Sequence, residues 1–139
     1  MTVPVLQIQR PYAFTSPVAG EVFAALLLVV DPTITQDERA SLAEQMVSQG
    51  CRYAVCAGFD CSLWDDAIDM ASVMTEIDGS PQHGFVMTTW HENEPLEEVV
   101  EFFKKWALID NEPPAQRVAI LLGEDPARRS ELLQRLEAQ

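Results

Sequence analysis

The chain repeats one pattern four times: a short apolar run is followed by a stretch in which apolar residues recur at helical spacing. The apolar runs are Val22–Val30, Cys51–Ala57, Phe85–Trp90 and Val118–Leu122. A continuous apolar run suits a strand covered on both faces, and strands that alternate with helices are joined by right-handed crossovers into a parallel sheet. The pattern therefore predicts an α/β three-layer sandwich with a mostly parallel four-stranded sheet and four helices, of the Rossmann-like or flavodoxin-like kind.

Local signals mark the ends of the predicted helices. Thr35 and Glu38 have the spacing of a capping box, and Gly50 suits the left-handed residue that ends a helix. Pro95 fits the first turn of the third helix, and Asp125 stands where the last helix opens. These boundaries place a strand-to-helix turn after every predicted strand.

The order of the strands decides where a ligand would bind. We expect a single domain over residues 1–139, with residues 1–21 as an N-terminal arm or edge strand, because Pro4 cannot donate a sheet hydrogen bond. For the four predicted strands we expect the order 2-1-3-4. That order places the topological switch point, where open α/β sheets tend to bind ligands, between the first and third strands.

The charge restricts the class of partner. The chain has 22 Asp and Glu residues against 9 Lys and Arg, for a formal net charge of −13. Nucleic-acid binding needs basic residues that displace counterions from phosphate, and anionic membranes repel an acidic surface. We therefore expect neither a nucleic-acid nor a membrane partner. A basic protein partner fits the charge, which could also serve solubility alone.

The cysteines and the N-terminus indicate the compartment. The three cysteines, Cys51, Cys56 and Cys61, are an odd number, which argues against a disulfide framework. The first residues show no signal-peptide organisation. We therefore expect a cytoplasmic protein with reduced thiols.

The turns after parallel strands meet at one edge of the sheet, and here they are rich in acids. Most of these carboxylates can be explained by helix capping and by the helix dipole. Capping does not explain the aromatic residues and the histidine that accompany them at the second and third turns. The predicted partner-binding residues are Trp64, Asp65, Asp66, Trp90, His91, Glu92 and Glu94. Trp64 also fits the apolar stripe of its helix, which would place it in the core.

His91 is the best candidate for acid–base chemistry. A small enzyme or ligand sensor would use His91 together with Asp31 or Glu94, in a crevice at the switch point. No other catalytic residue is expected. This alternative requires a concave site in which His91 reaches a second polar group.

Cofactor and metal motifs are missing. Neither a GxGxxG fingerprint nor a GxxxxGK[ST] loop follows a strand, so no nucleotide cofactor is expected. A zinc site would have to join His91 with Cys56, Cys61 or His83, but no CxxC or HExxH spacing is present, and a metal site is not expected.

Two segments of the chain resemble a known family. The segments CSLWDD (Cys61–Asp66) and VMTTWHENEPLEE (Val86–Glu98) are similar to a small bacterial family of uncharacterised α/β domains. The resemblance implies a bacterial origin and a compact α/β fold. It supplies no catalytic residues.

Three functions remain open from the sequence. The leading hypothesis is a non-enzymatic, acidic protein-binding domain, in its most concrete form a bacterial immunity or antitoxin-type protein that neutralises a basic partner. The alternative is the small enzyme or sensor with His91. A homodimer is also possible, because Phe102 beside Phe103 widens the apolar side of the third helix.

Overall fold

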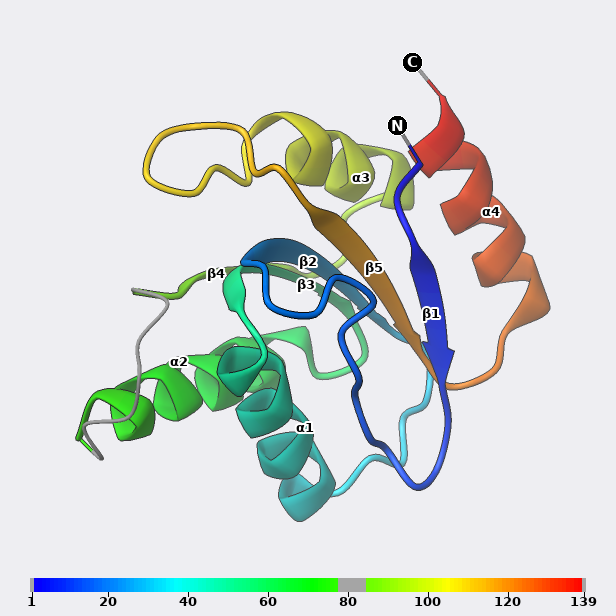
Figure 1. Ribbon diagram of the computed structural model, residues 1–139. Coiled ribbons are helices and arrows are strands. Elements are labelled where there is room, and N and C mark those ends of the chain that lie inside the picture. Colours follow the sequence, from blue (N-terminus) through cyan, green and yellow to red (C-terminus); the bar gives the residue numbers. More distant parts are fainter. Residues whose placement is uncertain (1, 78–84, 139) are drawn as a thin grey trace.

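The computed structural model describes residues 2–77 and 85–138 of the chain (Figure 1). Its strands are β1 (Val5–Ile8), β2 (Phe23–Val29), β3 (Cys51–Gly58), β4 (Met87–His91) and β5 (Arg117–Leu122). Its helices are α1 (Gln36–Ser48), α2 (Cys61–Ile77), α3 (Leu96–Lys105) and α4 (Pro126–Glu137). None of the helices in these two ranges is both long and apolar enough to span a bilayer.

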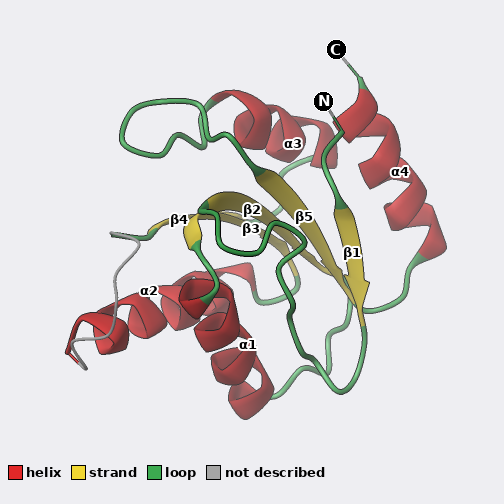
Figure 2. Ribbon diagram, in the orientation of Figure 1, coloured by secondary structure: helices red, strands yellow, loops and turns green. Residues whose placement is uncertain are grey.

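The sheet is parallel throughout and lies between two layers of helices. Its strand order is β1-β5-β2-β3-β4. Helices α1 and α2 cover one face, and α3 and α4 cover the other (Figures 1 and 2). All seven residues of β2 are buried, as expected for a strand covered on both sides. The predicted α/β architecture with a parallel sheet and four helices is confirmed.

The predicted number and order of strands are wrong. Residues Val5–Ile8 form a fifth strand at the edge beside β5, and β4 lies at the opposite edge instead of next to β2. From β2 the chain adds β3 and then β4 toward one edge of the sheet. It then returns and adds β5 on the other side of β2. The switch point lies between β2 and β5, not between the first and third predicted strands.

Composition accounts for this difference. In β4 the residues Thr88 and Thr89 are half-buried and Trp90 is exposed, which suits an edge strand. The run Val118–Leu122 in β5 is fully buried, which suits the middle of the sheet. The predicted order placed the more polar strand inside, where its side chains would have been covered.

Most of the predicted helix boundaries are confirmed. Thr35 accepts a hydrogen bond from the backbone N–H of Glu38, whose carboxylate accepts one from the N–H of Thr35 in return. Gly50 has a φ of +111°, and a Cβ there would lie 2.5 Å from the carbonyl oxygen of Glu21. Asp125 caps α4. Pro95 is the residue before α3 instead of part of its first turn.

Candidate functional site at the carboxyl edge of the sheet

The second and third strand-to-helix turns lie side by side. They follow β3 and β4, which pair in parallel with Cys56 opposite Trp90 and Ala57 opposite His91. Both turns therefore leave the sheet at the same level of its carboxyl edge. The sequence prediction that residues of these two turns converge there agrees with this register.

The first turn has a structural role. The Asp31 carboxylate accepts hydrogen bonds from the Tyr12 hydroxyl at 2.5 Å and from the backbone and hydroxyl of Thr33 at 2.8 and 2.6 Å. Arg10, 3.6 Å from Asp31, also binds both carboxylate oxygens of Glu38. The bonds from Thr33 and Tyr12 hold the pKa of Asp31 down at about 2. Asp31 thus fastens the N-terminal segment to the end of β2.

The second turn depends on Gly58. Its φ is +91°, and a Cβ at this position would overlap the carbonyl oxygen of Val29. The same carbonyl accepts a hydrogen bond from the N–H of Phe59 at 3.0 Å. Glycine therefore lets the turn lie against the end of β2, and Phe59 and Asp60 project from it into solvent.

Two of the predicted partner-binding residues of the second turn are inside the protein. Trp64 is fully buried, and the guanidinium of Arg39 lies 6.0 Å from the centroid of its ring. Asp65 is 4% exposed, and its Oδ2 has no hydrogen-bond partner among the described residues. Burial raises the pKa of this carboxyl. Asp66, in contrast, is exposed.

The third turn holds a fixed histidine. His91 is 8% exposed, with Nε2 2.9 Å from Thr89 Oγ1 and Nδ1 3.1 Å from Glu94 Oε2. The ring of Phe102 packs against it with 4.7 Å between centroids. Because Glu94 accepts, Nδ1 carries the proton of this bond. Trp90, next to His91, is 53% exposed.

What remains at the surface is a set of apolar side chains among acids. We call it the acidic turn surface, and it consists of Phe59, Asp60, Leu63, Asp66, Trp90, Glu92 and Glu94, all exposed. Among the described residues, no Lys or Arg side chain pairs with any of its carboxylates. Residues 53–103 contain no Lys or Arg at all. The negative charge of this surface is therefore not neutralised locally.

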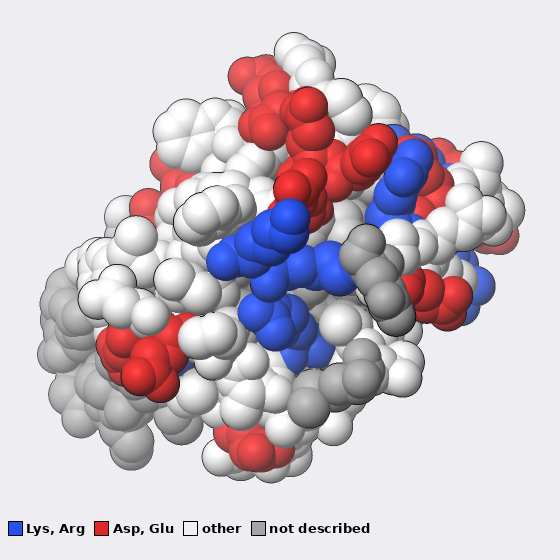
Figure 3. All heavy atoms as spheres, turned by 90° about the horizontal axis from the view of Figure 1, so that it is seen from above, with Lys and Arg blue, Asp and Glu red and all other residues white. Residues whose placement is uncertain are grey.

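Positive charge gathers at the opposite end of the sheet. Arg52 and Arg117 stand at the starts of β3 and β5, and Lys104 and Lys105 end α3. Viewed from this end, basic side chains form a cluster in the middle of the molecule (Figure 3). Acids adjoin this basic cluster, since Arg52 pairs with Asp110 and Lys105 with Glu101, and the carboxyl edge has cations of its own in Arg10 and Arg128. The second and third turns are set apart by acids that have no Lys or Arg partner among the described residues.

A crevice of about 420 Å³ opens at the carboxyl edge, between the ends of β2 and β3 and the starts of α3 and α4. His91 and Glu94 line it together, with Phe59, Leu96 and Arg128 around them. Asp31, the other predicted partner of His91, is not in its lining. The sequence analysis missed Arg128, because the fourth turn could be explained by capping alone.

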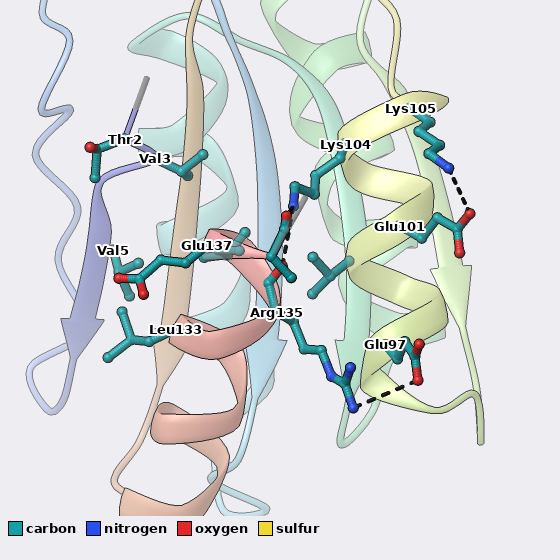
Figure 4. Close-up of a pocket in the computed structure, with 13 residues that line it drawn as sticks. Thr2, Val3, Val5, Glu97, Glu101, Lys104, Lys105, Leu133, Arg135 and Glu137 are labelled. Atoms are coloured by element: carbon teal, nitrogen blue, oxygen red, sulfur yellow. Dashed lines mark hydrogen bonds and ion pairs between the residues drawn. The ribbon is translucent and has the colours of Figure 1, made fainter.

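A larger groove of about 860 Å³ lies between α3, α4 and β1 (Figure 4). Its charged rim is internally paired: Lys105 meets Glu101 at 2.9 Å and Arg135 meets Glu97 at 3.6 Å. Lys104 donates to carbonyl groups at the end of α4. No sequence motif marks this groove, because it arises from the way two helices and the N-terminal strand pack.

The cysteines are buried free thiols. Burial raises the pKa of all three, in Cys51 to about 12, so the thiolate form is disfavoured. Within residues 2–77 and 85–138, no group of three His, Cys, Asp or Glu side chains could hold a metal ion. His83, the fourth residue of the zinc hypothesis, lies outside the described residues.

Comparison with known proteins identifies the family but no activity. No curated protein and no solved structure matches this chain. A family model described as "Domain of unknown function (DUF7684)" matches residues 3–139. The match covers nearly the whole chain, including both turns of the acidic turn surface, and the protein therefore belongs to this family of uncharacterised domains.

Proposed function

We propose that this protein is a non-enzymatic binding protein that docks a basic protein partner on the acidic turn surface. The concrete form of the proposal is an immunity or antitoxin-type protein of the bacterial cytoplasm that neutralises a toxin. One observation carries it: exposed apolar side chains stand among carboxylates that have no Lys or Arg partner in the described structure, in a stretch of 51 residues, 53–103, without a single Lys or Arg.

The two kinds of side chain have different roles in docking. Phe59, Leu63 and Trp90 supply apolar area that a partner can desolvate, and aromatic anchors of this kind carry much of the binding energy at interfaces. Asp66 and Glu92 supply the charge that speeds the encounter with a basic surface.

The buried members of the predicted site act by positioning. Trp64 packs α2 onto the sheet, so that Leu63 and Asp66 face solvent. His91 ties the end of β4 to Glu94, just before the start of α3. These residues shape the surface without contacting the partner.

The test is affinity purification from the native host with charge-reversed bait. The variant Asp66→Lys/Glu92→Lys should lose a basic protein that the wild type retains. The variant Glu44→Lys/Glu112→Lys carries the same change of net charge on exposed residues outside the acidic turn surface and should still retain it. Equal recovery by all three baits would contradict the proposal.

The crevice supports a second candidate, a small enzyme or ligand sensor. The observation in its favour is that His91 and Glu94 meet in a concave site of about 420 Å³, as this alternative requires. NMR spectra of labelled protein in mixtures of small metabolites would show shifts of crevice amides, abolished by Arg128→Ala. Spectra that no mixture perturbs would count against it.

A further inference from the structure

The exposed apolar side chains of this protein are concentrated on one side. Of the nine large ones in the described residues, seven lie on α2 or on β4 and its entry. Leu63, Met70, Val73 and Met74 line the outer side of α2 and are 45–60% exposed. Phe85, Met87 and Trp90, at or just before β4, are 47–62% exposed. We call these seven residues the lateral face.

The lateral face includes an open edge of the sheet. β3 pairs with one side of β4, and no described strand pairs with its other side. Natural edge strands are usually protected by charges, prolines or bulges, but the sequence of β4, MTTWH, has no proline, acid, Lys or Arg. At the other edge, Val5 and Leu6 of β1 are half-buried against the two cores. Of the two edge strands in the described part of the chain, only β4 thus combines an unpaired backbone with large exposed apolar side chains.

Apolar side chains of β4 lie on both faces of the sheet. Trp90 stands opposite Cys56, which belongs to the core under α1 and α2, so Trp90 lies on that side of the sheet. Met87 stands opposite Tyr53, which belongs to the core under α3 and α4. A strand added to β4 would therefore cover apolar side chains above and below its backbone hydrogen bonds.

The exposed apolar area of the lateral face is close to that of a protein interface. Half-exposed side chains of this size leave on the order of 100 Å² each uncovered, so the lateral face presents about 700 Å². Monomers rarely expose a contiguous apolar patch larger than roughly 300–600 Å². A standard interface buries about 800 Å² per partner. The lateral face alone comes close to the amount that one copy must bury in a stable dimer.

We propose that two copies of this chain associate through the lateral face, with their β4 strands paired antiparallel about a two-fold axis. Such a contact is self-complementary, because the same strand and the same helix face meet themselves. It joins two five-stranded sheets into one continuous sheet and brings the α2 helices together over one side of it. The carboxyl edges of the two sheets then point in opposite directions.

This dimer goes beyond the proposed function, and its surface overlaps the acidic turn surface in part. Leu63 and Trp90 belong to both the lateral face and the acidic turn surface, whereas Met70, Val73 and Met87 belong to the lateral face alone. The two associations also respond to salt with opposite signs. Two copies, each with a net charge of −13, repel each other, so salt should strengthen the dimer. Salt should weaken docking of a basic partner.

The homodimer expected from the sequence would have used α3. Phe103 is fully buried there, and Phe102 packs on the rings of His91 and Tyr53. These two side chains are therefore part of the fold and do not form the dimer surface.

Sedimentation velocity of the purified full chain tests the proposal. The wild type should show a species of twice the 15.5 kDa chain mass as its concentration rises into the high micromolar range, and more of it at 0.5 M than at 0.05 M NaCl. Met87→Lys/Trp90→Lys should weaken dimerisation at least tenfold. The control is Trp106→Lys. Trp106 is exposed at the C-terminal end of α3, outside the lateral face, so this substitution should leave dimerisation unchanged.

Two additions keep the test decisive. If the double variant does not fold, Met70→Lys on the exposed side of α2 replaces it. Hydrogen exchange should slow in β4 amides as the wild type is concentrated. A monomer at all concentrations and salts overturns the proposal. So does a dimer that survives the lysine substitutions, or one that salt dissociates.

Discussion

Among the acids at the carboxyl edge of the sheet, Asp31 has the clearest structural role, because it is bound by Tyr12. The hydroxyl of Tyr12, a buried residue, donates to Asp31 and helps to keep the pKa of that carboxyl at about 2, below its ordinary value of 3.8. Because the folded pKa is depressed, the charged form of Asp31 stabilises the fold above pH 3.8, and this contribution is lost as the pH falls through 2. The first turn therefore contributes to acid stability instead of binding.

Tyr12→Phe should lower the free energy of unfolding at pH 7 by about 1–2 kcal/mol, because a hydrogen bond to a charged group is lost while the ring packing remains. The difference from the wild type should persist down to pH 4 and shrink toward pH 2. Urea unfolding at pH 7, 4 and 2 measures it. A difference of the same size at pH 7 and pH 2 would show that Asp31 is not the partner that matters.

The pKa of Asp65 is shifted in the opposite direction to that of Asp31. Its Oδ2 is buried without a hydrogen-bond partner among the described residues, and burial raises its pKa, so its charge opposes folding above the ordinary carboxyl range. Asp65→Asn keeps the shape and removes the charge. It should therefore raise the free energy of unfolding at pH 7 by about 1 kcal/mol. The gain should vanish near pH 3, where the wild-type carboxyl is protonated in both states, and a constant gain would contradict the assignment.

The tryptophans show what single residues could and could not reveal in the sequence. Trp64 recurs at helical spacing with Ile68 and Ala71, which marked the core position that it occupies. Trp90 lies in a strand, and its exposure depends on whether that strand is inside the sheet or at its edge. That depends on strand order, which single residues do not encode. The exposure of Trp90 could therefore be predicted only once the order of the strands was known.

At the scale of elements, the second turn should depend on Gly58. Gly58→Ala forces a Cβ into the backbone of Val29 at a φ of +91° and should cost more than about 2 kcal/mol of unfolding free energy. The matched control is Gly20→Ala, where φ is +83° but the space around the position is open, so that about 1 kcal/mol is expected. Thermal unfolding of both variants measures the difference. Equal losses would mean that the close approach at Gly58 is unimportant.

The elements also differ in how far the sequence could predict them, because some are set by local and others by long-range interactions. Helix α1 has its capping box and its terminal glycine within a few residues, so its ends are set by local chemistry. The order of β2 to β5 is set by long-range packing of similar apolar runs. The polar composition of β4 was the available hint that it lies at an edge, and the same placement creates the lateral face.

At the scale of the whole molecule, the basic cluster and the acidic turn surface lie at opposite ends of the sheet. The amino end carries the Lys and Arg cluster of Figure 3, and the carboxyl edge carries the acidic turn surface. The acids of this surface should attract a basic partner, which raises the association rate without adding contacts. The net charge alone predicts a basic partner, but the place where that partner would dock could be proposed only from the fold.

The measurement that tests the central claim most directly is the rate of association with the basic protein recovered from the host, followed by stopped flow between 0.05 and 0.5 M NaCl. For the wild type the rate constant should fall at least about tenfold over this range. Asp66→Lys/Glu92→Lys should be slow at low salt and nearly independent of it, and Glu44→Lys/Glu112→Lys should behave much more like the wild type. Identical salt dependence in all three proteins would contradict docking on the acidic turn surface.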